Sequence, residues 1–230
     1  MPIGSLDVIN NFPYQDIRDY YAKWYRPDLQ GIMIVGDINV DEMEAKLKKV
    51  FADVKAPVHP ANRIYYPVAD NQEPLIFIGT DKEIETPSIS FFFKSEAFPD
   101  SLKNTINYYG IQYMLSMGIS MLNSRLAEIR QQADPPFTGA SAGYGDFFVA
   151  KTKSAFGIDA SSKIGGIELA MKTILEEAER ARRFGFTETE YDRARANYLQ
   201  RVESAYNERE KMKNDTYVNE YISNFLDNEP

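Results

Sequence analysis

The stretch YYAKWYRPDLQGIMIVGD, residues 20–37, decides how the rest of the chain is interpreted. Its aromatic start continues a helix predicted over 14–25, where apolar side chains recur at helical spacing. The Arg-Pro-Asp that follows ends this helix, because the residue before a proline avoids helical backbone. The apolar run from Ile32 to Val35 then predicts a strand. One helix and one strand cannot bury themselves, so this stretch must pack on another part of the chain or on a partner.

The composition is that of a globular protein. The chain has 230 residues, of which 43% are hydrophobic and 26% are charged, enough for one full domain and part of another. Its net charge of -8 argues against a nucleic-acid partner, because phosphate binding needs clustered Lys and Arg. No run approaches the roughly 18 apolar residues that span a bilayer. Residues 1–11 lack the basic flank and apolar centre of a secretion signal.

The chain contains no cysteine and only one histidine, His59. The absence of cysteine excludes thiol catalysis, disulfides and every zinc or iron–sulfur site that needs cysteine. His59 lies in the proline-rich stretch 56–60, and a single loop histidine does not make a metal site without converging ligands. We assign no role to it.

The apolar periodicity divides the chain into three parts. Residues 1–55 hold the helix and strand described above and a capped helix over 40–52. Residues 56–73 are rich in proline and are predicted to be a linker. Residues 74–230 are predicted to form a second unit. Its expected elements are strands over 75–78 and 88–94, one bent helix or two over 103–132, and a hairpin of 137–150 and 152–160. Further helices are expected over 161–183, from 187 to beyond Arg209, and over 216–227. This order predicts an α+β fold with a largely antiparallel sheet and helices over one face.

No motif for nucleotide binding or serine catalysis is present. The glycines at 139, 143 and 145 are not followed by Lys-Ser/Thr, and no Gly-x-Ser-x-Gly elbow occurs. The carboxylates on the predicted helices alternate with Arg and Lys, which is typical of a solvated helix face. Nothing in their spacing favours a two-carboxylate hydrolase.

Two features have both a structural and a functional interpretation. Met114, Met117 and Met121 recur at helical spacing, which favours core packing over an adaptable partner groove. The aromatic strand from Ile89 to Phe93 is either a buried strand, the favoured interpretation, or an edge to which a peptide adds as a further strand.

Several motifs follow one another in a specific order. Trp24-Tyr-Arg-Pro27, Ile34-Val-Gly-Asp37 and a capped helix ending at Phe51 come first, with Pro2-Ile-Gly4 before them. The later motifs are Leu122-Asn-Ser-Arg-Leu126, Glu128-Ile-Arg130, and Gly185-Phe-Thr-Glu188 with Glu190. In this order and spacing they resemble the pitrilysin-type (insulinase-like) zinc metallopeptidases, the inverzincins, over essentially the whole chain.

The resemblance implies that the zinc-binding and catalytic residues lie in another part of a longer parent protein. The family carries His-x-x-Glu-His on a helix, with two zinc-binding histidines and a glutamate that activates the metal-bound water. This chain has no such motif, so no catalytic residue and no metal ligand is carried over, and zinc is expected only in the parent. Residues 1–55 then correspond to the tail of the catalytic domain, and residues 74–230 to the noncatalytic domain of the first half.

The resemblance also suggests two candidate substrate-binding positions. In a later noncatalytic domain of the family, an Arg and a Tyr seven residues further on hold the substrate. Arg130 matches that Arg, but position 137 is Phe137, which lacks the phenol that would donate a hydrogen bond. The other interpretation of Arg130 is a helix-end cation or an ion pair at a domain interface.

Two functions are compatible with these observations. The first is a noncatalytic piece of a zinc endopeptidase that builds the substrate chamber and orients a peptide by its sheet edge. Its implied partners are a peptide or unfolded protein substrate, the preceding catalytic domain and a second peptidase half. The alternative is a noncatalytic structural or assembly module of the same fold without peptidase activity. The compartment is left open between the bacterial periplasm and the cytoplasm.

We also expect the apolar residues Trp24, Ile32 and Phe51 of the N-terminal part to pack on the later domain or on a neighbouring chain.

Overall fold

The computed structural model describes residues 4–230 and forms two compact units. One unit comprises Met1–Ile64 and Lys213–Asp227, and the other comprises Tyr65–Met212 and Asn228–Pro230. We call them the N-terminal unit and the sheet unit. Pro2 and Ile3, which belong to the first motif of the family resemblance, lie outside the described residues.

The described part of the N-terminal unit is helical. Its elements are α1 (Leu6–Asn11), α2 (Tyr14–Trp24), the 3-10 turn η1 (Pro27–Leu29), α3 (Val40–Val50) and α8 (Asn214–Asp227). The helices expected over 14–25, 40–52 and 216–227 are therefore confirmed, and α1 was not expected. Arg26 explains why the chain turns after α2. Its side chain is buried, donates a 2.5 Å hydrogen bond to the Ala61 carbonyl and pairs with Asp28 at 3.2 Å.

The strand predicted from Ile32 to Val35 is wrong. These residues have no regular secondary structure, and Ile32 and Ile34 are 53% and 43% exposed. A strand exists only where a neighbouring strand accepts its hydrogen bonds, and none of the described elements of the N-terminal unit is a strand. The apolar run has the composition of a strand, but composition alone does not show whether a neighbouring strand is present to pair with it.

The sheet unit is built on three antiparallel strands. They are β1 (Ser88–Glu96), β2 (Gly139–Asp146) and β3 (Lys153–Ser161), in the order β1-β3-β2. The predicted strand over 88–94 and the predicted hairpin are confirmed. The first hairpin strand ends earlier than predicted, because Phe148 has a positive φ of 55° and Ala150 donates a hydrogen bond back to the Phe147 carbonyl, closing a turn.

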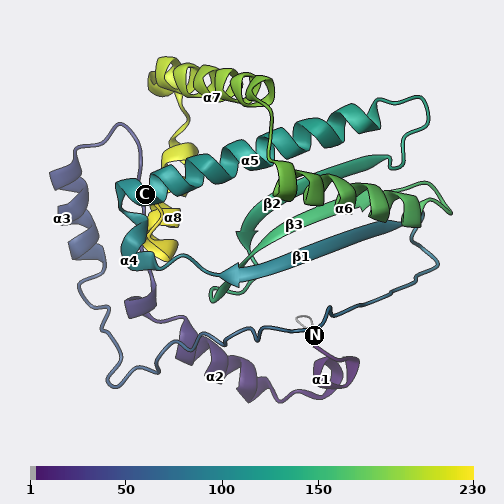
Figure 1. Cartoon of the computed structure of the whole chain (residues 1–230). Coiled ribbons are helices and arrows are strands. Elements are labelled where there is room, and N and C mark those ends of the chain that lie inside the picture. Colours follow the sequence, from purple (N-terminus) through teal and green to yellow (C-terminus); the bar gives the residue numbers. More distant parts are fainter. Residues whose placement is uncertain (1–3) are drawn as a thin grey trace. The chain divides into compact units, whose positions relative to one another are not determined.

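Helices cover one face of this sheet. The helices of the sheet unit are α4 (Asp100–Lys103), α5 (Ile106–Arg130), α6 (Ile167–Phe184) and α7 (Glu188–Glu208), with the 3-10 turn η2 (Arg209–Lys211) after α7. Figure 1 shows α5 and α6 lying along the same face of the sheet. The α+β fold class is therefore confirmed. The segment over 103–132 is one long helix, α5, preceded by the short α4, and Gly110 and Gly118 do not interrupt it. α6 begins six residues later than predicted, since Ser161 still pairs in β3 and Gly165 has a positive φ of 80°.

The core lies between α5, α6 and the sheet. Its buried members are Leu122, Leu126, Phe137, Ala142, Ile158, Ala160, Ala170 and Ile174. Leu126, Ile158, Ala170 and Ile174 have no exposed surface. These residues come from five separate segments, so removing any large one leaves a cavity that the others cannot fill.

The predicted strand from Leu75 to Ile78 is also wrong. The segment has no regular structure, and its four side chains are 82–92% exposed. β1 pairs with β3 on one side, and none of the described residues pairs with its other edge. An apolar run of this length favours a strand, but without a hydrogen-bonded neighbour and a covering layer it stays extended and exposed.

A mostly buried ion pair joins α5 to the start of α7. Arg125 donates from Nε to Glu190 at 2.5 Å and from Nη2 to the second carboxylate oxygen at 2.9 Å. Nη2 also donates to the Gly185 carbonyl at 3.0 Å, and the guanidinium lies 4.6 Å from the ring centre of Phe186. The side chains are 10% and 14% exposed. The pair thus fixes the turn between α6 and α7 against α5.

Glu190 has a second role as a cap. Its carboxylate accepts from the backbone N–H of Thr187, and Thr187 Oγ1 accepts in return from the N–H of Glu190. These two bonds form a capping box at the start of α7. Gly185, the C-cap of α6, has φ 67° and ψ -148°, a conformation almost restricted to glycine.

We expect Glu190→Gln to destabilise the chain by about 3 kcal/mol, because it leaves the buried guanidinium of Arg125 without a carboxylate. Urea unfolding followed by circular dichroism measures the change. Glu179→Gln is the matched control. Its carboxylate is 40% exposed, so the loss should be much smaller than that of Glu190→Gln. Thr187→Ala isolates the cap and should cost about 1 kcal/mol. Equal losses in the two glutamate variants would contradict this account.

The same pair predicts a pH dependence. Hydrogen bonds from Arg125, and then from Thr187, lower the pKa of Glu190 from 4.5 to about 2. Because the pKa is lower in the folded state than in the unfolded chain, this stabilisation is complete above about pH 5 and is lost as the pH falls towards 2. The difference in unfolding free energy between the wild type and Glu190→Gln should therefore shrink between about pH 5 and pH 3. A difference that stays constant over this range would refute the linkage.

Candidate functional site

Strand alternation gives the sheet two faces with different chemistry. Phe91 and Ile158 oppose each other in the β1–β3 register and pack into the core under the helices. Phe92 and its partner Gly157 point to the opposite face, which we call the helix-free face. Each of the two faces is a candidate site.

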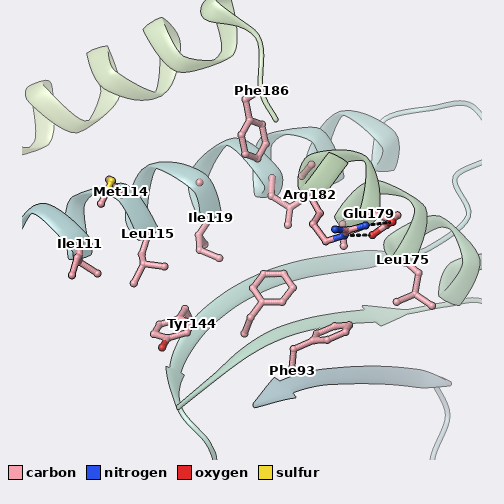
Figure 2. A pocket seen from close by; sticks show the side chains of 15 residues that line it. Phe93, Ile111, Met114, Leu115, Ile119, Tyr144, Leu175, Glu179, Arg182 and Phe186 are labelled. Atoms are coloured by element: carbon pink, nitrogen blue, oxygen red, sulfur yellow. Dashed lines mark hydrogen bonds and ion pairs between the residues drawn. The ribbon is translucent and has the colours of Figure 1, made fainter. Parts of the chain in front are cut away.

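An apolar cleft of about 830 Å³ opens on the helix side, between α5, α6 and the sheet. Figure 2 shows side chains from all three directions lining it. Its lining residues are Phe93, Ile111, Met114, Leu115, Gly118, Ile119, Leu122, Tyr144, Phe156, Leu175, Ala178, Glu179, Ala181, Arg182 and Phe186. The predicted packing role holds for two of the three methionines, since Met117 and Met121 are buried and Met114 is 64% exposed beside this cleft.

The charged groups of the cleft neutralise each other. Glu179 accepts hydrogen bonds from Arg182 at 2.7 and 2.8 Å and from Arg183 at 2.5 Å, and Figure 2 shows the pair with Arg182. The hydrogen bonds from Arg182, and then those from Arg183, lower the pKa of Glu179 to about 2. Its carboxylate is therefore ionised at neutral pH and is not available as a general acid. The cleft offers an apolar surface with a paired charge, which suits contact rather than chemistry.

The helix-free face exposes peptide backbone. A Cβ atom added at Gly139, Gly143 or Gly145 would meet no other atom within 4 Å. At Gly157 the added atom would lie 3.5 Å from the ring of Phe92. Phe92 in turn contacts Phe148, with ring centres 5.0 Å apart. This face therefore combines a bare strand backbone with a small aromatic cluster.

One end of the helix-free face is closed by the segment before β1. Lys153 is only 6% exposed and lies between Asp70, at 2.9 Å, and Glu96. Hydrogen bonds to Glu96, and then to Asp70, raise the pKa of Lys153 above its ordinary value. The backbone N–H of Val68 donates to Thr152 Oγ1 at 3.3 Å. The open part of the face is thus the end that carries Gly139, Ser141 and Gly143.

The free edge of β2 meets a side chain of α5. The Asn123 carboxamide donates to the Ala142 carbonyl at 2.9 Å and accepts from the Ala142 N–H at 2.7 Å. Sequence reasoning did not single out Asn123, because an asparagine beside a buried leucine carries no signal of its own. Arg125 was also missed as a structural residue, although a cation at core spacing between Met121 and Leu126 is a signal of a buried ion pair.

The structure does not place the two candidate substrate-binding residues on one exposed surface. Arg130 is exposed at the last turn of α5. Phe137 is 1% exposed and belongs to the core cluster. Among the described residues, no ion pair to Arg130 is found. Its role in substrate binding stays a prediction, whereas the ring of Phe137 is a packing group.

The described residues offer no donor set for zinc. Within residues 4–230, no group of three or more His, Asp or Glu side chains is arranged to hold a metal ion, and His59 is exposed. These residues therefore do not fit the zinc site of the resembled family. In the same part of the chain, no helix has both the length and the apolarity needed to cross a bilayer.

Comparison with known proteins gives related sequences of greater length. The chain is 27% identical to a protein of Arabidopsis thaliana called "Zinc protease PQQL-like", over all of this chain and 21% of that protein. It is 22% identical to "Probable zinc protease PqqL" of Escherichia coli, again over the whole chain and over 24% of the relative. The chain thus spans about a quarter or less of the length of these relatives.

Solved structures show the same fold. The periplasmic protease PqqL from Escherichia coli matches with a TM-score of 0.82 and 21% identity, over all of this chain and 25% of that one. The structure of the first half of the same protease matches with a TM-score of 0.76 and 20% identity, over 48% of its length. The family model described as "Peptidase M16 inactive domain" matches residues 11–198. The chain therefore belongs to the pitrilysin-type M16 peptidase family and matches the inactive domain of that family.

Proposed function

We propose that this chain is a noncatalytic part of the first half of a two-half zinc endopeptidase and forms part of its substrate chamber. One observation carries the proposal: the family model of the inactive domain matches residues 11–198, most of the chain. The fold similarity to the first half of PqqL supports a place in the first half. Zinc and the catalytic groups are then supplied by the preceding domain of the parent protein.

The proposed domain division follows the linker. Residues 1–55 form the end of the catalytic domain, residues 56–73 the linker, and residues 74–230 the noncatalytic domain. The boundary between the two compact units, at residues 64 and 65, falls within this linker and supports the division. The segment Lys213–Asp227, however, is grouped with the N-terminal unit and not with the rest of residues 74–230.

The helix-free face is the proposed chamber-facing surface. The helices bury the opposite face except at the cleft, so the open face is where an extended peptide can approach the sheet directly. Exposed glycines leave this face of β2 without side chains, and the rings of Phe92 and Phe148 offer apolar contact. The substrate class is a peptide or an unfolded protein segment. The Escherichia coli relative is described as periplasmic, so the periplasm is the proposed compartment of the parent.

A noncatalytic assembly module is the second candidate, and one observation favours it. Leu75 to Ile78 form an exposed apolar run that suits burial against another subunit. The sequence upstream of Met1 in the parent distinguishes the two functions. His-x-x-Glu-His within about two hundred residues, roughly one domain length, supports the peptidase. A parent without this motif supports the assembly module.

We expect the isolated chain to bind no stoichiometric zinc and to leave a long unstructured peptide intact. The chain has a single histidine and no cysteine, and the described carboxylates do not converge. Zinc retained after dialysis is measured by plasma mass spectrometry, and peptide cleavage is followed by mass spectrometry with and without zinc. Zinc retained at one equivalent at a His/Glu site, or cleavage that depends on zinc, would overturn the noncatalytic assignment.

Truncating Arg130 should affect substrate binding, whereas truncating Phe137 should affect stability. Arg130→Ala removes an exposed side chain, so stability should change by less than about 0.5 kcal/mol. In the parent protease it should raise KM for a long peptide while kcat is unchanged, since only binding is lost. Phe137→Ala should cost about 3–5 kcal/mol, because it leaves a cavity in the core. An unchanged KM in Arg130→Ala would assign that side chain to the helix end alone.

A further inference from the structure

The outer edge of β2 is closed by a side chain at one residue. β2 is the last strand on its side of the sheet, so its outer edge faces no other described strand. At Ala142, the Asn123 carboxamide forms one hydrogen bond to the backbone carbonyl and one from the N–H, at 2.9 and 2.7 Å. Ala142 itself is 9% exposed. The backbone N–H and C=O of this buried edge residue are therefore hydrogen-bonded, although no strand lies beside them.

The directions of these bonds follow from the antiparallel pairing. In such a pair, alternate residues bond to the partner strand, and the residues between them direct N–H and C=O outward. Phe147 donates to the Lys153 carbonyl, which places the odd-numbered residues of β2 towards β3. Ala142 therefore points outward, as its bonds to Asn123 require, and so do Ala140 and Tyr144. Asn123 occupies the groups that an added strand would use.

The carboxamide is suited to this role. It presents one donor and one acceptor side by side, as a backbone residue does in a hydrogen-bonded strand pair. Asn123 lies next to Leu122 on α5, and Leu122 is 4% exposed in the core, so the amide is held at a fixed position. The cap is therefore built into the packing of α5 on β2.

Other protection of this edge is sparse. β2 reads GASAGYGD, with small residues, no proline, no lysine and a single charge at Asp146, its last residue. Natural edge strands are usually protected by charges, prolines or bulges, because an open edge pairs with other chains. A flat, small-residue strand also specifies its register weakly. The capped residue lies in the middle of the outward-facing groups, where it interrupts any continuous ladder.

We propose that Asn123 is an edge cap that prevents the β2 strands of two copies of this chain from pairing. Without the amide, Ala140, Ala142 and Tyr144 present an uninterrupted row of outward N–H and C=O groups. The partner that matches this row is the same strand of a second copy, in antiparallel order about Ala142. With Asn123 in place, only the outward N–H and C=O groups on either side of Ala142 can pair with an added strand.

The test compares Asn123→Leu with the wild type in the full 230-residue chain. Leucine removes both hydrogen bonds and keeps the helix propensity of α5. We expect the Ala142 amide to exchange with solvent about tenfold faster at low protein concentration, and self-association to tighten about tenfold by sedimentation velocity. Ser124→Ala is the matched control, because its hydroxyl bonds only to the Ser120 carbonyl in the same helix, and it should change neither measurement.

A double variant tests whether association runs through β2. Ser141 is exposed on the helix-free face, so Ser141→Lys places like charges on paired strands without entering the core. Asn123→Leu with Ser141→Lys should return to wild-type association. Association that persists in the double variant, or Asn123→Leu that associates like the wild type despite faster exchange, would overturn the proposal.

If Asn123→Leu does not fold, Asn123→Ala is compared with the wild type in the same way, because it removes the amide without adding a bulky side chain. In the wild type alone, the Ala142 amide should be protected from exchange relative to Tyr144, two residues along the same edge. Equal exchange at these two amides would show that the cap is absent and would refute the proposal.

Discussion

The ion pair between Arg125 and Glu190 is the interaction on which the rest of the sheet unit depends. It joins two residues 65 positions apart, on α5 and α7, and holds the carbonyl of Gly185 in the turn between α6 and α7. Removing one partner leaves the other charge unpaired, although its side chain is about nine-tenths buried. Because α6 must stay packed beside α5 over the sheet, this pair fixes both the core and the cleft between the two helices.

The two faces of the sheet follow from this arrangement. Helices held on one side leave the other side open, with bare glycine backbone at β2 and an aromatic cluster at Phe92. The proposed noncatalytic role suits this arrangement, because the domain presents a sheet face and a capped edge to an extended chain. The proposed cap at Asn123 fits this arrangement, since an open sheet edge must avoid pairing with other copies of the chain.

The predictions from sequence succeeded where the signal was local. The predicted helices over 40–50 and 188–208 begin after the caps Asn39 and Thr187, whose partners lie three residues away. They failed at Ile32 to Val35 and at Leu75 to Ile78, where apolar runs have the composition of strands but no described neighbour pairs with them. Phe137, a substrate-binding candidate by resemblance, lies in the core.

The sequence by itself determined the presence of most helices, the α+β class, the family motifs and the lack of a zinc-binding sequence, because each rests on residues close together in the chain. Only the tertiary structure decided which face of the sheet is open, that Arg125 pairs with Glu190, and that Asn123 closes the β2 edge. These features depend on contacts between residues 19 to 65 positions apart, and a side chain's partner across such a separation leaves no local pattern.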